Sequence, residues 1–396
     1  MGQPINPAFA ATFPPPVMEA RRWIADKSFG DDKPLLNLSQ AAPVDPPPEG
    51  LVRAMAEAMI TDASTHLYGP VLGREDLRQE LAMQWSGAYG GDIAPEQVAI
   101  TAGCNQAFTA ALSTLAGAGD EVILPLPFYF NHQMWLDMAG IRGVYLPTGD
   151  DLLPDPEAAA ALITDRTRAI VLITPNNPTG KEYPPALMRA FFELARMRGL
   201  ALIVDETYRD FHAASGAPHN LFADPDWDDT LIHLYSFSKA YRLTGHRVGA
   251  IMASTARLDE VEKFLDTVAI CPPQVGQIGA LWGMRHLSHW LAGERDEILA
   301  RRAAAEAGFA RLAGWDLLGC GAYFAYVRHP FAAPSDMVAK ALVDQAHLLV
   351  LPGTMFGPTR QQGGSGQAEA TLRIAFANAD KAGLDAVVTR LAQVDL

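Results

Sequence analysis

Seven short apolar runs, rich in β-branched residues, alternate with helical patterns along the first two thirds of the chain. The runs are VAITAG, EVILPLP, GVYLP, AIVLITP, LALIVDE, TLIHLYS and RVGAIMAS. Continuous apolar runs are typical of strands buried on both faces, and parallel strands are joined by crossover helices. The stretch PPALMRAFFELARMRG begins with prolines and ends at glycine, as such a helix does. The pattern therefore predicts an α/β fold with a mostly parallel seven-stranded sheet covered by helices.

The segments on either side of this stretch have different patterns. Residues 1–48 are rich in proline, which predicts an extended arm and linker that partly contributes to a smaller domain. Residues 49–275 are expected to form the large domain. Residues 276–396 open within a helical tract, roughly 274–313, and continue with the runs AYFAYV, LLVLPG and TLRIAFA. They predict a second, smaller α/β domain.

Charge and cysteine content narrow the classes of function. A formal net charge of -14 and a pI near 5.1 oppose binding to nucleic acid or to anionic membranes. Cys104, Cys271 and Cys320 are too few and too scattered for a disulfide framework or a spaced zinc site, so we expect a reducing compartment and no metal. The N-terminus lacks the features of a signal peptide, and no apolar run is long enough to cross a bilayer. We therefore expect a cytoplasmic protein.

Polar and aromatic side chains follow the ends of five of the apolar runs. Gly103, Cys104 and Asn105 follow VAIT and open a helix, and Tyr129 follows EVILPLP. The segments PNNPTG, DETY and SFSK follow three further runs. Ligands of open α/β sheets bind at the carboxyl ends of the strands. We therefore expect an acid, an amide, an aromatic ring, a hydroxyl and an amine to meet there.

Each of these features also has an ordinary structural explanation. Lys239 could be a solvated amine, and a serine nucleophile with the S-x-x-K spacing would also need S-D-N and K-T-G segments, which do not occur. Asp205 could cap a helix, although a carboxylate at the end of an apolar strand is costly to bury without a cation. NNPTG could be a simple turn, and residues 103–105 could be only a helix start. Arg247 could pair with a surface acid, and Tyr129 could lie in the core.

Together these groups favour one cofactor. An amine that can form a Schiff base, a buried acid, a phosphate cradle and a flat aromatic ring are what pyridoxal phosphate requires. The chain resembles the fold-type I pyridoxal-phosphate aminotransferases of classes I and II. The resemblance runs from YGPVLGREDLR (68–78) through TAGCNQA, PNNPTG, DETY and SFSKAYRLTGHRVG to PGTMFG (352–357) and TLRIAFA. It covers nearly the whole chain and implies the fold of that family.

The resemblance implies a role for each residue around the cofactor ring. Lys239 would hold the cofactor as a Schiff base and then move the proton between the substrate Cα and the cofactor C4′. Asp205 would keep the pyridine nitrogen protonated. Asn177 and Tyr208 would hydrogen-bond to the ring 3-oxygen, and Tyr129 would stack on the ring face.

The resemblance also implies how the phosphate and the substrate are held. The phosphate would be bound by a set of backbone amides and side chains: Gly103, Cys104, Asn105, Ser236, Arg247 and Tyr68. Tyr68 would come from the neighbouring subunit, which implies a homodimer with shared active sites. Arg373 would grip the substrate α-carboxylate in a bidentate manner, and Asn177 and the backbone amide of Ala41 would also contact the substrate.

Two positions depart from the pattern of the family. Arg242 stands where the family's lysine signature usually has a small residue, and we expect its side chain to point to solvent. Ala41 stands where relatives often carry a glycine that offers a backbone amide to the substrate. The amide remains available in alanine, so we expect substrate binding to persist in a slightly tighter pocket.

The leading hypothesis is transamination, in which an L-amino acid gives its amino group to a 2-oxo acid. A β-elimination lyase or a decarboxylase could use the same lysine, aspartate and arginine. A cofactor-sensing regulator would need a DNA-binding module, whereas the roughly forty-five residues before the large domain are proline-rich and the chain is acidic. Aromatic residues near the expected mouth, including Tyr68 and Phe356, favour a neutral or aromatic amino acid as substrate.

Overall fold

The computed structural model describes residues 3–396 and contains a large central sheet with the strand order β2-β8-β7-β6-β5-β3-β4. Its strands are β2 (Val98–Thr101), β3 (Glu121–Pro125), β4 (Arg142–Leu146), β5 (Thr167–Ile173), β6 (Ala201–Asp205), β7 (Leu231–Ser236) and β8 (Gly249–Met252). Strand β8 is antiparallel to both of its neighbours, and the other pairs are parallel. The prediction of a mostly parallel seven-stranded sheet is confirmed.

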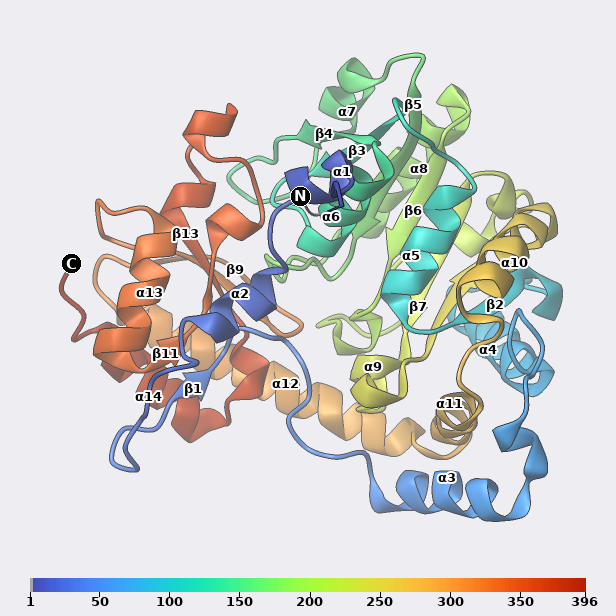
Figure 1. The fold of residues 1–396 in the computed structure, drawn as a ribbon, viewed down its shortest axis with the longest axis horizontal. Helices are drawn as coiled ribbons and strands as arrows, with labels where there is room; N and C mark the ends of the chain where they lie inside the picture. The colour runs from blue at the N-terminus through green and yellow to red at the C-terminus, as the bar shows by residue number, and fades with distance from the viewer. Residues whose placement is uncertain (1–2) are drawn as a thin grey trace.

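Helices cover both faces of this sheet (Figure 1). One face packs against α5 (Cys104–Ser113), α6 (Phe130–Ala139) and α10 (Thr255–Ala269), and the other against α4 (Glu75–Tyr89), α7 (Pro156–Leu162), α8 (Pro185–Arg198) and α11 (Gln274–His286). Strand β5 shows why, because Ile170 and Leu172 face one helical layer while Ala169 and Val171 face the other. Both faces of such a strand must be apolar, which explains its continuous apolar sequence.

A smaller sheet lies to one side, with the order β12-β13-β10-β9 and antiparallel pairing throughout. Its strands are β9 (Asp316–Gly321), β10 (Phe324–Arg328), β12 (Leu351–Pro352) and β13 (Thr371–Ile374). The helices α12 (Ser288–Phe309), α13 (Ser335–Ala346) and α14 (Lys381–Leu391) accompany it. Helix α12 runs from this sheet toward α11 (Figure 1). The division of the chain into domains at residues 48 and 275 stays a prediction.

The N-terminal segment is more regular than its sequence predicts. It contains α1 (Pro7–Ala11), α2 (Pro16–Arg22) and β1 (Leu36–Asn37), which pairs in parallel with β11 (Leu348–Leu349). Helix α3 (Glu49–Thr61) follows. The expectation of a wholly extended arm is therefore wrong. Proline breaks a helix in its interior but suits its first turn, and both short helices begin at a proline.

Helix α2 packs against the rest of the protein and is not an exposed arm. Ala20 is buried in a cluster with Phe130 and Phe356, and Val17 packs against the same cluster. This packing places α2 beside the carboxyl edge of the large sheet. Within residues 3–396, every helix is too short or too polar to cross a membrane.

Candidate active site

A cavity of about 600 Å³ opens where the carboxyl ends of β5, β6 and β7 meet helix α2 and strand β13. Eleven of the sequence-predicted residues line it: Ala41, Cys104, Asn105, Tyr129, Asn177, Asp205, Tyr208, Ser236, Lys239, Arg247 and Arg373. Gly103, the N-cap of α5, comes directly before Cys104 in the chain. The structure thus brings together side chains that the sequence spreads over more than three hundred positions.

Lys239 lies on the one-turn helix α9 (Phe237–Ala240), which starts where β7 ends. Its Nζ donates a hydrogen bond to the carbonyl oxygen of Ala41 at 2.5 Å. Burial lowers the pKa of the Lys239 amine to about 7, and the positive charges of Arg373 and Arg247 act in the same direction. A large fraction of this amine is therefore neutral and nucleophilic near neutral pH.

Asp205 is the last residue of β6 and is buried. Its Oδ1 accepts hydrogen bonds from the backbone N–H and the hydroxyl of Thr207, at 3.0 and 2.7 Å, and its Oδ2 lies 3.5 Å from Nε2 of His132. Burial by itself would raise the pKa of this carboxyl, but His132 and Thr207 outweigh it and hold the pKa below its usual range. Asp205 therefore stays ionised inside the cavity.

Arg373, on β13, is 2% exposed, yet its hydrogen-bond acceptors are neutral. Nη1 donates to Oδ1 of Asn177 at 2.9 Å, and Nη2 donates to the carbonyl oxygen of Ser39. Its Nε is buried without a hydrogen-bond partner among residues 3–396. Burial lowers the pKa of Arg373 to about 10, so the group is still a cation. A buried guanidinium held this way is suited to bind a carboxylate.

The start of α5 forms a cradle for an anion. Gly103 has φ 89, and a Cβ at this position would collide with the guanidinium of Arg247. Glycine therefore allows Arg247 to lie against the first turn of the helix, whose leading amides have no partner within the helix. Ser236, the last residue of β7, lines the same cavity. Helix amides, a cation and a hydroxyl are the donors that a phosphate group requires.

A profile of the family described as "Aminotransferase class I and II" matches residues 33–391. The chain belongs to this family. Among its relatives, an aromatic aminotransferase of Arabidopsis thaliana is 27% identical over 367 residues, which are 90% of this chain and 88% of that protein. An arginine–pyruvate transaminase of Pseudomonas aeruginosa is 30% identical over 331 residues, 82% of this chain and 83% of that protein.

Solved structures show the same fold. The aspartate aminotransferase from Thermus thermophilus with maleate superposes with a TM-score of 0.89 at 23% identity, covering 99% of this chain and all of that one (100%). A putative kynurenine aminotransferase from Saccharomyces cerevisiae superposes with a TM-score of 0.88 at 21% identity, covering 99% of each chain. The chain is an amino-acid aminotransferase with the α/β architecture of fold type I.

Two aromatic residues of this aminotransferase do not lie at the mouth of the cavity. Tyr68 is 79% exposed and lines a separate hollow with Ser64, Arg74 and Gln274. Its contribution to a neighbouring subunit's site stays a prediction. Phe356 is fully buried, with its ring 4.8 Å from the Arg373 guanidinium. The expectation that Phe356 lines the mouth is wrong, because it packs behind the arginine.

The expectation that Arg242 points to solvent is also wrong. Its side chain is only 20% exposed and lies 2.7 Å from Glu294 and 3.5 Å from Asp45. Both partners are far from it in the sequence, and one is on α12. No local pattern could have revealed this pairing.

Several residues in or next to the cavity escaped the sequence analysis. His132 and Thr207 contact Asp205, and Thr207, Ser238 and Thr244 line the cavity. A local signal existed for the first two. His132 is three positions after Tyr129 at the start of α6, about one helical turn away, and Thr207 lies within DETY.

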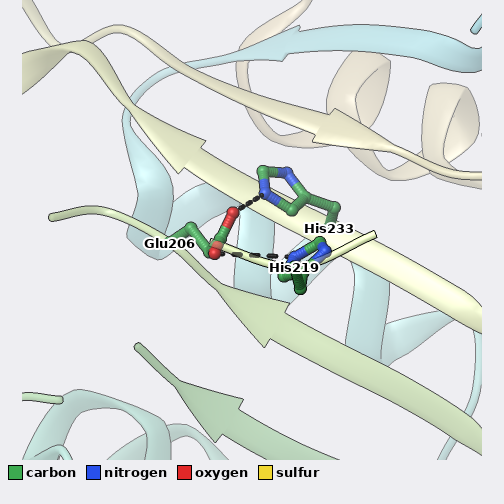
Figure 2. Close-up of side chains that lie close together, drawn as sticks. All are labelled: Glu206, His219 and His233. Carbon is green, nitrogen blue, oxygen red and sulfur yellow. Dashed lines mark hydrogen bonds and ion pairs between the residues drawn. The ribbon is translucent and has the colours of Figure 1, made fainter. Parts of the chain in front are cut away.

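A second buried polar cluster contains Glu206, the residue after Asp205 in the chain. Figure 2 shows Glu206 between His219 and His233. His233 Nε2 donates to the Glu206 carboxylate at 2.7 Å, His219 Nε2 lies 3.5 Å from it, and the hydroxyl of Tyr89 also donates to it. Burial would raise the pKa of Glu206, but the charge and hydrogen bonds of the two histidines hold it well below its usual range. We interpret the cluster as a buried polar network built on Oε2 of Glu206, which accepts from both His233 and Tyr89. Oε1 faces His219 and has no hydrogen-bond partner among residues 3–396.

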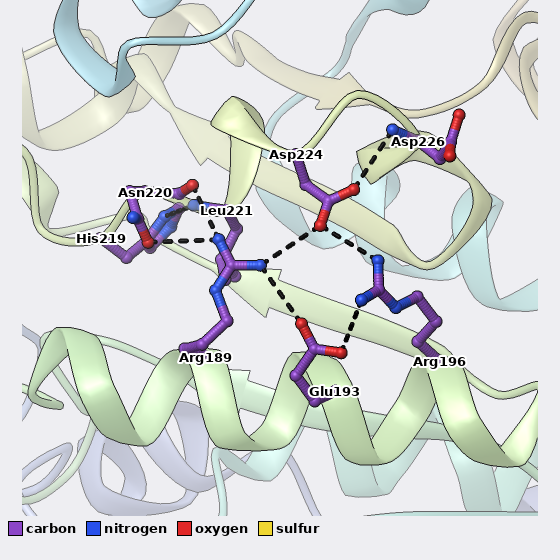
Figure 3. A network of polar contacts seen from close by, with 8 residues as sticks. All are labelled: Arg189, Glu193, Arg196, His219, Asn220, Leu221, Asp224 and Asp226. Atoms are coloured by element: carbon purple, nitrogen blue, oxygen red, sulfur yellow. Dashed lines mark hydrogen bonds and ion pairs between the residues drawn. The ribbon is translucent and has the colours of Figure 1, made fainter.

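A surface network holds the segment that carries His219 (Figure 3). Arg189 and Arg196 of α8 lie 3.5 and 3.0 Å from the Asp224 carboxylate, and Glu193 pairs with both arginines. Arg189 also donates to the backbone carbonyl of Asn220 at 3.0 Å. These contacts tie the segment to the helical layer behind β6.

Proposed function

We propose that this aminotransferase uses pyridoxal phosphate to move the amino group of an L-amino acid to a 2-oxo acid. The observation that carries the proposal is a buried lysine amine with a pKa of about 7 in the same cavity as a buried, ionised aspartate. Lysines with lowered pKa values form Schiff bases with carbonyl groups. The membership of the family supports the same cofactor.

The residues of the cavity fit this cofactor at three points. Arg247 and the start of α5 form a cradle that a side chain at Gly103 would fill. Asp205 offers a carboxylate to a protonated ring nitrogen. Arg373 has a buried Nε without a partner among the described residues, where a substrate carboxylate would bind. When bound, pyridoxal phosphate supplies a ring that accepts electrons from the substrate Cα.

In the proposed mechanism Lys239 has two tasks. Its amine would hold the cofactor through the cofactor's aldehyde group, and the same amine, with a pKa of about 7, would accept the proton of the substrate Cα and later donate it again. Asp205, whose carboxylate stays ionised, would face the protonated ring nitrogen. His132 and Thr207 keep the Asp205 carboxylate ionised and fixed in direction.

The remaining residues would bind and orient. Asn177 and Tyr208 would donate to the ring 3-oxygen, and Tyr129 would stack on the ring. The phosphate would be held by Gly103, Cys104, Asn105, Ser236 and Arg247, and by Tyr68 of a second copy of the chain. Arg373 would bind the α-carboxylate, beside Asn177 and the backbone amide of Ala41.

We propose a neutral or aromatic amino acid as the donor. The side chains that line the cavity include Val17 and Met18 of α2 and the rings of Tyr129 and Phe130. Arg21 of α2 also lines it and donates a hydrogen bond to Oε1 of Gln40 at 2.8 Å. Asp205, the one acidic side chain among the described residues that line the cavity, faces His132 and Thr207. Because Arg21 already donates to Gln40, the apolar side chains of this lining favour an uncharged substrate side chain.

Three further parts of the proposal concern the whole protein. It would act as a homodimer with shared active sites, it would be cytoplasmic, and its large domain would comprise residues 49–275 between the arm 1–48 and the small domain 276–396. The exposure of Tyr68 at the surface of a single chain supports the first of these.

A panel of amino acids tests the proposal. Each amino acid is added to the cofactor-loaded enzyme with and without a 2-oxo acid, and the new amino acid, the new oxo acid and free ammonia are measured. We expect a new amino acid only when a 2-oxo acid is present, with methionine and phenylalanine preferred over aspartate. Release of pyruvate and ammonia without an acceptor, or carbon dioxide release, would contradict transamination, and a preference for aspartate would contradict the proposed donor.

A further inference from the structure

Arg242 connects three segments that are far apart in the sequence. Its Nε and Nη2 donate to Oε2 of Glu294 on α12, at 3.0 and 2.7 Å. Its Nη1 donates to the carbonyl oxygen of Pro46 at 3.3 Å and lies 3.5 Å from Oδ2 of Asp45. The guanidinium also lies over the ring of Trp290, 5.4 Å from its centre.

The backbone of Arg242 is held in an unfavourable conformation. Its φ is 56°, in the left-handed region that residues with a Cβ seldom adopt. Such a conformation persists only where the surrounding contacts enforce it. Trp290 and Glu294 are four residues apart on one face of α12, so together they form a rigid docking point for the guanidinium.

The segment bound by Arg242 leads directly into the active site. Between Ser39 and α3 it contains four prolines, at positions 43, 46, 47 and 48, which restrict its backbone and make it a semi-rigid spacer. Lys239, three residues before Arg242, holds the other end of this spacer through the carbonyl of Ala41. Arg373 holds the carbonyl of Ser39.

We propose that Arg242 is a positioning residue for the reaction. By fixing Asp45 and Pro46 against α12, it sets where the stiff segment 39–48 lies, and so places the backbone of Ala41 beside the Lys239 amine and the substrate. The effect on turnover rests on the proposed function. Because Arg242 lies outside the cavity lining, its loss weakens substrate binding more than the chemical step.

The substitution Arg242→Gly tests this inference. It removes the guanidinium and also relieves the strained φ, so the protein is expected to stay folded. In the cofactor-free protein we expect faster hydrogen–deuterium exchange of the amides in 39–48. In the loaded enzyme we expect KM for the amino acid to rise about tenfold while kcat changes less than about twofold. The second variant Glu294→Gln should shift both readouts in the same direction, and Arg242→Lys should restore part of the loss.

Arg295→Gln is the matched control. Arg295 also lies on α12 and joins it to the rest of the protein, through the carbonyl oxygens of His212 and Ala213 at 2.7 and 2.8 Å, but it does not contact segment 39–48. Its loss should leave the exchange of 39–48 and KM unchanged. Unchanged exchange and KM in both Arg242→Gly and Glu294→Gln, or equal changes in Arg295→Gln, would overturn the inference. The exchange measurement needs no turnover, so it stands even if the proposed function fails.

Discussion

Burial of the Lys239 amine makes it reactive but lowers the stability of the folded protein. Burial disfavours the protonated amine, which lowers its pKa to about 7. An unfolded chain would bind that proton up to its usual pKa of 10.5. Above 10.5 both states are neutral and the lysine costs no stability. As the pH falls from 10.5 to 7 the unfolded state gains protons that the folded state does not, so the stability of the folded state falls.

Lys239→Met should therefore stabilise the cofactor-free protein. We expect the gain in Tm to be largest at and below pH 7 and to shrink as the pH approaches 10.5. The amine lowers the free energy of unfolding by its full amount only when the lysine is protonated in the unfolded state, and the substitution removes that loss. Thermal unfolding followed across this range measures it. Lys263 on α10 is a control, since its side chain is 70% exposed and pairs with Glu260 on the surface. A gain that is the same at every pH would contradict the burial argument.

At the scale of single residues, the sequence predicted what local motifs determine. Lys239, Asp205 and Arg373 each lie at the end of a run or within a motif, and the structure places all three in one cavity. Arg242 and Phe356 were predicted wrongly because their positions depend on partners distant in the sequence, Glu294 for one and Arg373 for the other. Motif spacing carries no information about such contacts.

At the scale of elements, composition determined which strands could be foreseen. Each of the seven strands of the large sheet overlaps one of the predicted apolar runs, because burial on both faces demands apolar side chains. Strands β4 and β5 begin one and two residues before their runs, at Arg142 and Thr167. Strand β9 was not foreseen, since it begins at Asp316 and contains Gly319 and Gly321. Its own residues do not favour a strand, so its extended conformation depends on pairing with β10.

Two polar networks on neighbouring elements should differ in their contribution to stability. Glu206 is fully buried, and His233 and Tyr89 donate to its carboxylate. The amide of Glu206→Gln carries no charge and places two N–H donors among these donors, so the change should lower the free energy of unfolding by about 3 kcal/mol. Asp224→Asn disturbs a network whose two arginines are 30% and 44% exposed, and should cost less than about 1 kcal/mol. Urea unfolding of the two variants, which make the same carboxylate-to-amide change, measures the difference. Equal losses would contradict the assignment of Glu206 to the core.

At the scale of the whole molecule, one residue of the proposed site, Tyr68, lies away from the cavity of its own chain. Eleven predicted residues line the cavity of Lys239, whereas Tyr68 lies at the surface and lines a hollow with residues of α4 and α11. The sequence resemblance implied that a second copy supplies it. The position of Tyr68 within one chain agrees with that idea, but the arrangement of two copies depends on surfaces that no motif describes.

Mixing two inactive variants tests the shared site. Lys239→Ala removes the amine and Tyr68→Ala removes the residue that a partner would contribute. In a mixed dimer one site combines the intact Lys239 of one copy with the intact Tyr68 of the other. With random exchange of subunits, half of the dimers are mixed and each has one complete site, so about a quarter of the wild-type activity should return. No recovery after subunits have exchanged, shown by native mass spectrometry, would contradict the shared site.

The most direct test of the central claim is the covalent bond at Lys239. The purified protein is incubated with pyridoxal phosphate, reduced with borohydride, digested and analysed by mass spectrometry, with Lys239→Ala as the control. We expect one stable pyridoxyl adduct, located on Lys239, and none at that position in the variant. An absence of adduct, or an equal distribution over surface lysines such as Lys263 and Lys340, would contradict the account.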